Sequence, residues 1–523
     1  MHKHDDTLSM VHRWTNSNYL LKQGGFLMKK VIVSLLALIM VFSMTGCKKK
    51  VTATFAEDLK WDEEKQEYAF EKNAKLKLWT DNDEFAAKVL ELWNAKYPDV
   101  ELTYDNVGST DIAEKMKLDG PAGLGADVFY IPHNSIVDMR ESGLLFQLSE
   151  KDEAYIKSTM QDSATAVTLF EDNMYAIPSS VENVAFLYNK QILEALPTLP
   201  TVLPLTATNL LEQVENEEIY LEELLAGVAA WGNNFAGTGA TIPYLEERFE
   251  SEGEEQAVAE DKHTILAWQL YDAYHNYFLL TRDGYRVFGE DNNDPTKFDI
   301  DSPLVTSSIK SVTGDWYGNK DGSKLFPGLA TIQDMGWDQG PARFQKGQVA
   351  MTFSGPWVIS DIKKNFSTWA ETGKFGITAD TKVSDIFGAC KLPRFNNDQQ
   401  PVTFSGVQVT GMNVYTDYPN AAMNLMRFLA SDEIMNVVYD VMGKIPAVKE
   451  SASVPGLNED TVSQGFLSQA EYSHAMPVIQ EGNYMWDPLR DVWTNLFDEK
   501  MSVEDAQAKS SEDYKKILEN AGK

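Results

Sequence analysis

Strands and helices alternate over residues 75–143, and this pattern restricts the fold more than any other feature of the chain. Apolar residues recur as in strands along Lys75–Thr80, Val100–Tyr104 and Ala126–Ile131. The segments between them carry helical signals, namely the spacing of Phe85, Val89, Leu92 and Trp93, a polar helix near Ile112–Leu118, and a later helix closed by Gly143. This βαβαβ order predicts a mostly parallel, doubly wound α/β sheet with helices on both faces.

A second strand-to-helix junction lies at residues 349–360. Apolar residues alternate up to Phe353, Gly355 permits a tight corner, and Pro356 suits the first turn of a helix. Trp357 therefore stands at the carboxyl end of a strand, where ligands bind in open α/β sheets. Taken alone, this tryptophan is either the wall of a cleft or a plug of the core.

The N-terminal region predicts export and a lipid anchor. Lys29-Lys30, the apolar run Val31–Met44 and Cys47 form a signal peptide whose apolar part is too short for a membrane span of about 20 residues. The end of this run resembles a bacterial lipobox, in which the cysteine is acylated. We therefore predict a mis-annotated extension at 1–27, a lipoprotein signal peptide at 28–46 and a lipid-anchored tether at 47–74.

Charge and cysteine content exclude several classes of protein. The 523 residues include 46 Lys and Arg against 78 Asp and Glu, and the net charge of −32 argues against a nucleic-acid partner. The length predicts at least two domains. After acylation of Cys47 only Cys390 remains, so no intramolecular disulfide is expected, and the seven His show no zinc-ligand spacing.

A cluster at Asp291–Asp294 suggests calcium at first sight. It lacks the glycine and the final acidic residue of a calcium loop, so we interpret it as a turn between Tyr285–Phe288 and Lys297–Ile300. We expect neither a metal nor a cofactor in this chain.

Several short stretches occur in an order that a known family shares. They are Lys77–Asp83, Ala126–Asn134, Glu141–Leu145, Tyr175–Glu182, Leu187–Lys190, Gly355–Trp357, Gly388–Pro393, Gly406–Asn413 and Trp486–Phe497. Each stretch is weak evidence alone, but their order and spacing are specific. Over about residues 75–523 the chain resembles the extracellular solute-binding proteins of ABC sugar importers, most closely the maltose/maltodextrin-binding protein family.

The resemblance implies a periplasmic-binding-protein-like (type II) α/β fold, in which two doubly wound lobes are joined by a hinge. On this chain the first lobe takes 75–181 and 409–448, and the second takes 185–404 and 450–523. The chain then crosses between lobes near Val181–Ala185, Phe404–Val409 and Ala447–Glu450. Hinge closure would bury a ligand and present one closed surface to a transporter.

The resemblance also implies a sugar site. The matching positions are Asp83 and Glu182 on the first lobe, and Asp272, Tyr274, Trp357 and Trp486 on the second. Aromatic rings offer flat apolar faces to sugar C–H groups, and carboxylates accept hydrogen bonds from several hydroxyls at once. Asn134 and Ser135 stand where the family has an acid/arginine pair, and we add Asn134 to the expected ligand residues.

Some of these residues also have a purely structural interpretation. Asp83 could cap the helix that follows the first strand, and Glu182 could be an exposed carboxylate near a hinge. Tyr274 lies in an aromatic run in which tyrosines are more often core residues. Trp486 begins a helix whose core stripe is Leu489, Val492, Trp493, Leu496 and Phe497, and its place at the N-terminal end favours the cleft. We interpret Trp79 and Trp93 as packing residues.

Departures from the family pattern restrict the ligand. Asp272 replaces a glutamate, and Ile131 replaces a tryptophan. The charged clamp of the maltodextrin binders is missing, because Asn134 and Ser135 replace the acid/arginine pair and Glu84 replaces a lysine. These changes weaken the case for maltose itself and leave neutral oligosaccharide binding intact. Three stretches also differ in length, at 196–218, 246–261 and 361–385, and the last of them makes Phe387–Leu392, rather than Phe375–Thr378, the expected strand.

The sequence thus predicts a monomeric lipoprotein on the extracytoplasmic face of the cell membrane. It captures a maltodextrin-like oligosaccharide and delivers it to the permease subunits of an ABC importer without enzymatic activity. One alternative is the same fold with another ligand, such as a different oligosaccharide, a polyamine or a metal–anion complex. The other is a lipid-anchored glycosidase, because paired carboxylates among aromatic rings can hydrolyse a glycoside.

Overall fold

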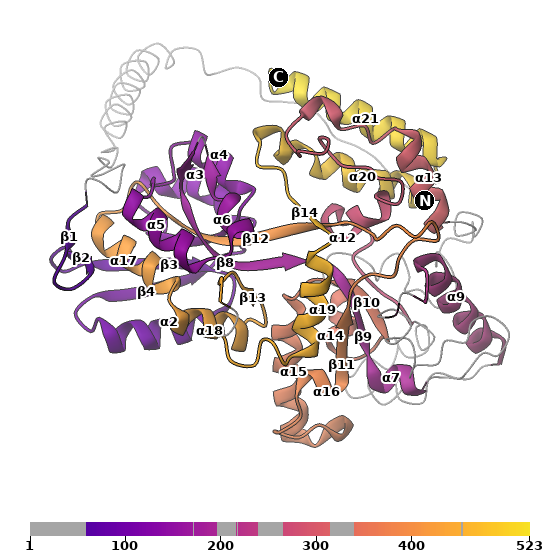
Figure 1. Cartoon of the computed structure of the whole chain (residues 1–523), viewed down its shortest axis with the longest axis horizontal. Helices are drawn as coiled ribbons and strands as arrows, with labels where there is room; N and C mark the ends of the chain where they lie inside the picture. The colour runs from indigo at the N-terminus through magenta and orange to yellow at the C-terminus, as the bar shows by residue number, and fades with distance from the viewer. Residues whose placement is uncertain are drawn as a thin grey trace, which may run out of the picture. The chain divides into compact units, whose positions relative to one another are not determined.

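The computed structural model describes residues 59–170, 172–195, 216, 218–238, 265–313, 339–450 and 453–523. These residues form two main sheets, each accompanied by helices (Figure 1). Two small hairpins pair β1 (Trp61–Asp62) with β2 (Glu67–Tyr68), and β6 (Leu169–Phe170) with β7 (Asn173–Met174).

The larger sheet has seven strands in the order β13-β8-β12-β5-β3-β4, with β14 beside β12. The strands are β3 (Lys75–Thr80), β4 (Glu101–Asn106), β5 (Val128–Pro132), β8 (Ala176–Asn183), β12 (Thr403–Met412), β13 (Ile445–Pro446) and β14 (Ser473–Ala475). The predicted parallel pairing of β3 with β4 and β5 is confirmed. The sheet is nevertheless mixed, because β12 returns from far along the chain and runs antiparallel to both β5 and β8.

The alternation along the strands divides the core of this sheet between its two faces. Leu76 and Leu78 of β3 join a cluster with α2 (Asp83–Lys96), α17 (Pro419–Leu429) and α18 (Asp432–Asp440). Trp79, one residue further on, joins a separate cluster with α3 (Ile112–Ala122) and α4 (Ser135–Glu141). Successive side chains of a strand point to opposite faces, so helices cover both, as predicted. Trp79 and Trp93 are fully buried packing residues, also as predicted.

The smaller sheet has three strands in the order β10-β9-β11. They are β9 (Ala185–Asn189), β10 (Met351–Ser354) and β11 (Phe387–Cys390), and both pairs are antiparallel. The strand predicted at Phe387–Leu392 is confirmed as β11, whereas residues 374–376 form a 3-10 turn (η6, Lys374–Gly376). The strand-to-helix junction is confirmed as well, since β10 is followed by α15 (Val358–Thr372).

The other helices are short or amphipathic. Those near the larger sheet are α5 (Glu150–Thr159) and α6 (Asp162–Ala166). The remaining α-helices are α7 (Lys190–Ala195), α9 (Leu221–Thr238), α12 (Ala273–Asn276), α13 (Pro303–Thr313), α14 (Gln339–Gln345), α16 (Val383–Ile386), α19 (Thr461–Ala470), α20 (Trp486–Phe497) and α21 (Val503–Asn520). Three more 3-10 helices are η2 (Tyr277–Leu280), η3 (Pro295–Lys297) and η8 (Gln480–Tyr484). Among the described residues, no helix combines the length and apolar character needed to cross a membrane.

The chain passes from one sheet to the other at Val184, which alone separates β8 from β9. It lies in the larger sheet again at β12, and it leaves that sheet after β13 to form α19, which packs on β11 (Figure 1). The predicted lobe boundaries remain predictions. Of the three length differences, 246–261 and nearly all of 196–218 lie outside the described residues, and 361–385 holds the body of α15, η6 and the start of α16.

The folded part begins earlier than the predicted tether allows. Tyr68 is buried at 2% exposure, its hydroxyl donates to Asp152 Oδ2 at 2.6 Å, and its backbone N–H donates to Asn424 Oδ1 at 2.8 Å. Residues 59–74 are therefore part of the packed structure, and the expectation of a tether up to residue 74 is wrong for this stretch. Its few apolar residues are too sparse to show a period, and they become buried only because α5 and α17 supply the other side of the contact.

A buried histidine links the larger sheet to the chain beyond β14. His133 is completely buried, its Nδ1 accepts the Val407 N–H at 3.0 Å, and its Nε2 lies 3.3 Å from the Met476 carbonyl oxygen, to which it donates. The neutral ring satisfies both bonds, because one nitrogen accepts and the other donates. Burial lowers the pKa of His133 to about 4.

This shift predicts a loss of stability in mild acid. The unfolded imidazole takes up a proton near pH 6.5, but the folded one does so only near pH 4, so protons favour the unfolded state. We expect the titration of His133 to lower the free energy of unfolding by about 3 kcal/mol as the pH falls from 6.5 to 4. Urea unfolding of the wild type and of His133→Gln over this range measures it. His474, whose pKa burial also lowers to about 4, is present in both proteins and contributes to both pH dependences. If the free energy of unfolding falls equally with pH in the two proteins, the assignment to His133 is wrong.

Candidate functional site

A cleft of about 1040 Å³ is lined by residues of strands β5, β8 and β12 of the larger sheet and by helices and turns around them. Six of the residues predicted from the sequence line it: Asn134, Glu182, Asp272, Tyr274, Trp357 and Trp486. They come from the start of α4, from β8, from the start of α12, from the turn before α15 and from the first residue of α20. Positions spread over most of the chain are thus brought to one cleft.

Asp83 is the exception. It is the first residue of α2, and its Oδ1 accepts a hydrogen bond from Asn106 Nδ2 at 2.7 Å instead of lining the cleft. The alternative that Asp83 caps the helix is also wrong, because Asn82 is the cap and accepts the Phe85 N–H at 2.8 Å. Since the cap lies at 82, Asp83 is carried into the first helical turn, and Asp81 stays in the loop and lines the cleft.

Glu182 is a buried carboxylate of the cleft. It lies near the end of β8 and is only 8% exposed. Its Oε1 forms an ion pair with Lys444 Nζ at 2.8 Å, and Gln408 Nε2 lies 3.4 Å from its Oε2. The expectation of a mere exposed carboxylate is therefore wrong. A buried carboxylate of this kind must have a compensating cation, and here the cation comes from the residue immediately before β13 (Ile445–Pro446) of the same sheet.

Lys444 was not identified from the sequence. It immediately precedes β13 and is 9% exposed, and it lines the cleft beside Glu182. Burial alone would lower the pKa of its ammonium group, but the carboxylates of Glu182 and Asp81 raise that pKa above its ordinary value. A sequence signal does exist, because Lys444 is the single charge within the apolar stretch 441–448 and a lysine is rarely buried unless it is paired.

Aromatic rings form a wall of the cleft. The Tyr274 ring stacks on Phe404 with centroids 6.0 Å apart and meets Trp357 edge-on at 5.9 Å. Trp486 meets the same Phe404 edge-on at 5.6 Å. The Tyr274 hydroxyl donates to the Glu182 carbonyl at 3.1 Å, which fixes the ring next to the ion pair. Burial, together with the charge of Glu182, raises the pKa of Tyr274 well above its ordinary value, so this hydroxyl remains protonated and able to donate.

Asp272 has a structural task as well as its place in the cleft. It caps α12, where its Oδ1 accepts the His275 N–H at 2.8 Å and lies 2.6 Å from His275 Nδ1. The His275 ring in turn meets the edge of Trp357 with centroids 5.4 Å apart. Asp272 therefore holds His275 in place against Trp357 of the aromatic wall. One of its two carboxylate oxygens, Oδ1, is already engaged in these contacts.

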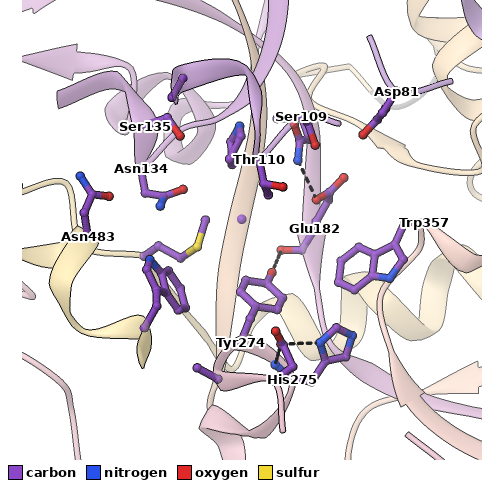
Figure 2. Close-up of a pocket in the computed structure, with 18 of the residues that line it drawn as sticks. Asp81, Ser109, Thr110, Asn134, Ser135, Glu182, Tyr274, His275, Trp357 and Asn483 are labelled. Atoms are coloured by element: carbon purple, nitrogen blue, oxygen red, sulfur yellow. Dashed lines mark hydrogen bonds and ion pairs between the residues drawn. The ribbon is translucent and has the colours of Figure 1, made fainter. Parts of the chain in front are cut away.

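Neutral polar groups occupy another part of the cleft. In the view of Figure 2, Asn134, Ser135 and Asn483 lie to one side of Tyr274, and Glu182 and Trp357 lie to the other. Amide and hydroxyl groups both donate and accept hydrogen bonds. The cleft thus offers amide and hydroxyl groups as well as the buried ion pair and the aromatic wall, and the combination suits a ligand rich in hydroxyls.

The known proteins to which this chain is similar are solute-binding proteins. The family described as bacterial extracellular solute-binding protein matches residues 88–463. The galactooligosaccharide-binding protein of Bacillus subtilis (strain 168) is 23% identical over 402 residues, which cover 75% of this chain and 78% of that protein. A maltooligosaccharide ABC transporter solute-binding lipoprotein of Streptococcus pneumoniae serotype 4 (strain ATCC BAA-334 / TIGR4) is 22% identical over 411 residues, 78% of this chain and 79% of that protein. The Thermus thermophilus maltotriose binding protein, solved with maltotriose, has a TM-score of 0.64 at 20% identity and covers 85% of this chain and 100% of its own.

Proposed function

The chain belongs to the bacterial extracellular solute-binding protein family, and from this premise we propose that it captures an oligosaccharide and delivers it to an ABC importer. The family and the α/β, type II periplasmic-binding-protein fold are those predicted from the sequence. The relatives named above bind oligosaccharides according to their names. Their identity to this chain is near 20%, so the ligand is argued from the cleft.

The observation that carries the proposal is the buried Glu182–Lys444 pair beside Tyr274, Trp357 and Trp486. A sugar hydroxyl both donates and accepts, so it can bond to the carboxylate and the ammonium group together. The rings supply apolar area for the sugar C–H faces. A cleft of about 1040 Å³ exceeds what a single small ligand needs and accommodates several sugar rings.

The ligand we favour is a maltodextrin-like oligosaccharide, and a different neutral oligosaccharide is the alternative. The acidic side chains of the cleft would attract a polyamine, but the Glu182 carboxylate is already paired with Lys444, and the aromatic wall favours a sugar. Hydrolysis is disfavoured because a glycosidase needs one carboxyl group that stays protonated as a general acid, whereas Glu182 is held in an ion pair. We propose that the protein performs no chemistry on the sugar.

We further propose that the protein is a monomeric lipoprotein on the extracytoplasmic face of the cell membrane, anchored through Cys47. The lipobox-like sequence supports this proposal, and Cys47 lies outside the described residues. Radiolabelled palmitate incorporated by the wild type but not by Cys47→Ala would support it. Label retained by the variant would contradict it.

A thermal-shift and calorimetry panel tests the proposed ligand class. The panel contains maltotriose, maltotetraose, a galactotriose, spermidine and ferric citrate. A sugar present at 100 times its Kd should stabilise the fold by about 2.7 kcal/mol. No shift and no heat with any sugar, or a response to spermidine alone, would contradict the proposal. Intact sugar recovered by chromatography after long incubation would exclude hydrolysis.

A glycine next to the aromatic wall provides a sharper test of Trp357. A Cβ placed on Gly355 would lie 2.0 Å from the Trp357 ring, so Gly355→Ala must move the ring. Loss of the aligned ring should weaken sugar binding by about 1–3 kcal/mol, as Trp357→Ala should. Calorimetry of the two single variants and the double variant measures this. In the Trp357→Ala background, Gly355→Ala should have no further effect, because the ring it displaces is gone. Additive losses would mean that Gly355 acts in some other way.

A further inference from the structure

The cations of the cleft differ in how firmly they are held. Three cationic side chains are among the described residues that line it: Lys117, Lys444 and Arg490. Lys117 pairs with Asp138 at 2.8 Å and Arg490 pairs with Asp487 at 2.7 Å, and their side chains are 32% and 46% exposed. Such exposed pairs contribute little and exchange readily with water. Lys444 is different, because its side chain is 11% exposed and faces a Glu182 side chain that is 8% exposed.

The position of Lys444 gives it two ways to act on a ligand. The ammonium nitrogen lies 2.8 Å from Glu182 Oε1, so the ion pair holds the carboxylate in place. An ammonium group has three donors, and the remaining ones are available to a ligand oxygen in the cleft that Lys444 lines. The second oxygen of Glu182 is near Gln408 Nε2, and the Tyr274 hydroxyl bonds the carbonyl of the same residue, so the whole unit is held rigidly.

We propose that Lys444 is a specificity-determining residue of this cleft, one that orients Glu182 and donates to an oxygen of the bound oligosaccharide. The proposal rests on the proposed function. Lys444 immediately precedes β13, which pairs with β8, and this pairing places its cation beside Glu182.

The experiment must separate a role in binding from a role in folding, since Lys444→Met alone leaves Glu182 buried without a counter-charge. The double variant Glu182→Gln/Lys444→Met removes both charges and restores a neutral pair of similar size. Lys444→Arg keeps the cation. Lys449→Met is the matched control, because Lys449 lies on the same stretch of chain but pairs with the exposed Asp162 at 2.8 Å and does not line the cleft.

Affinity is measured by calorimetry with maltotriose and galactotriose, and stability by urea unfolding. We expect Lys444→Met to lose at least about tenfold in affinity, Lys444→Arg to recover most of it, and Lys449→Met to bind as the wild type does. The double variant should regain stability without regaining affinity. If the double variant recovers affinity as well as stability, Lys444 has a structural role only and the inference is wrong. If the wild type binds sugar and Lys444→Met binds it with unchanged affinity, the inference is wrong but the proposed function stands. If the wild type binds neither sugar, both the proposed function and the inference are wrong.

Discussion

Replacing Glu182 with alanine is expected to lower the free energy of unfolding by about 3–5 kcal/mol, because the change leaves the ammonium group of Lys444 buried without its partner. The two side chains are 8% and 11% exposed, so water can replace the lost carboxylate only in part. The same variant should lose sugar binding, since the ionised acceptor is gone. Urea unfolding monitored by tryptophan fluorescence gives the stability, and calorimetry gives the affinity.

Two variants make the Glu182 result interpretable. Glu182→Gln keeps the shape and one acceptor oxygen, so it should be less destabilised than the alanine variant and still bind sugar poorly. Asp162→Ala removes the carboxylate of an exposed ion pair with Lys449 and should leave stability unchanged within error. A Glu182→Ala protein as stable as Asp162→Ala would mean that Lys444 finds another partner, such as Asp81, and would refute the buried-pair argument.

The two tryptophans of α20 are expected to respond in opposite ways. Trp493 is 1% exposed and stacks with Phe497 at a centroid distance of 6.1 Å, so Trp493→Ala should cost about 3–5 kcal/mol of unfolding free energy through the cavity it leaves. Trp486 is half-buried at the cleft, so Trp486→Ala should weaken sugar binding by about 1–3 kcal/mol with a much smaller loss of stability. Because both residues lie on one helix, each variant serves as the control for the other.

Measured stabilities and affinities of the two variants decide whether the division between core and cleft holds. A Trp486→Ala protein that unfolds as easily as Trp493→Ala would show that Trp486 is a core residue. Unchanged sugar affinity in Trp486→Ala would remove that ring from the site. The same comparison applies to Trp357, whose ring lies between His275, Tyr274 and the cleft.

Local patterns predicted the elements well wherever one face of an element is buried. Strands β3, β4 and β5 and helices α2 and α3 fall where periods of 2.0 and 3.6 residues placed them, and β11 lies at 387 as predicted. The segment before β3 was missed, because Tyr68 is buried by α17 and α5, whose sequences lie far from it. The mixed order of the larger sheet was missed for a similar reason, since no local pattern states which way β12 runs beside β5.

Predictions for the site depended on the register of each motif. Trp357 and Trp486 line the cleft because each stands at the end of an element, a position that the sequence shows, whereas Tyr274 was predicted from the resemblance alone. Asp83 was predicted because it matches the family motif, whereas the capping bond of Asn82 leaves Asp81 in the loop that lines the cleft. Their roles as ligand residues remain predictions until binding is measured.

By itself the sequence determined the family and the α/β class, and it predicted which aromatic residues line the cleft, because these follow from motifs and periods that are local along the chain. Only the tertiary structure decided that Lys444 compensates Glu182, that Tyr274 bonds the Glu182 carbonyl, and that Asp81 rather than Asp83 lines the cleft. The physical reason is that compensation of a buried charge depends on distance in space. Strands β8 and β13 are neighbours in the sheet although they are far apart in the sequence.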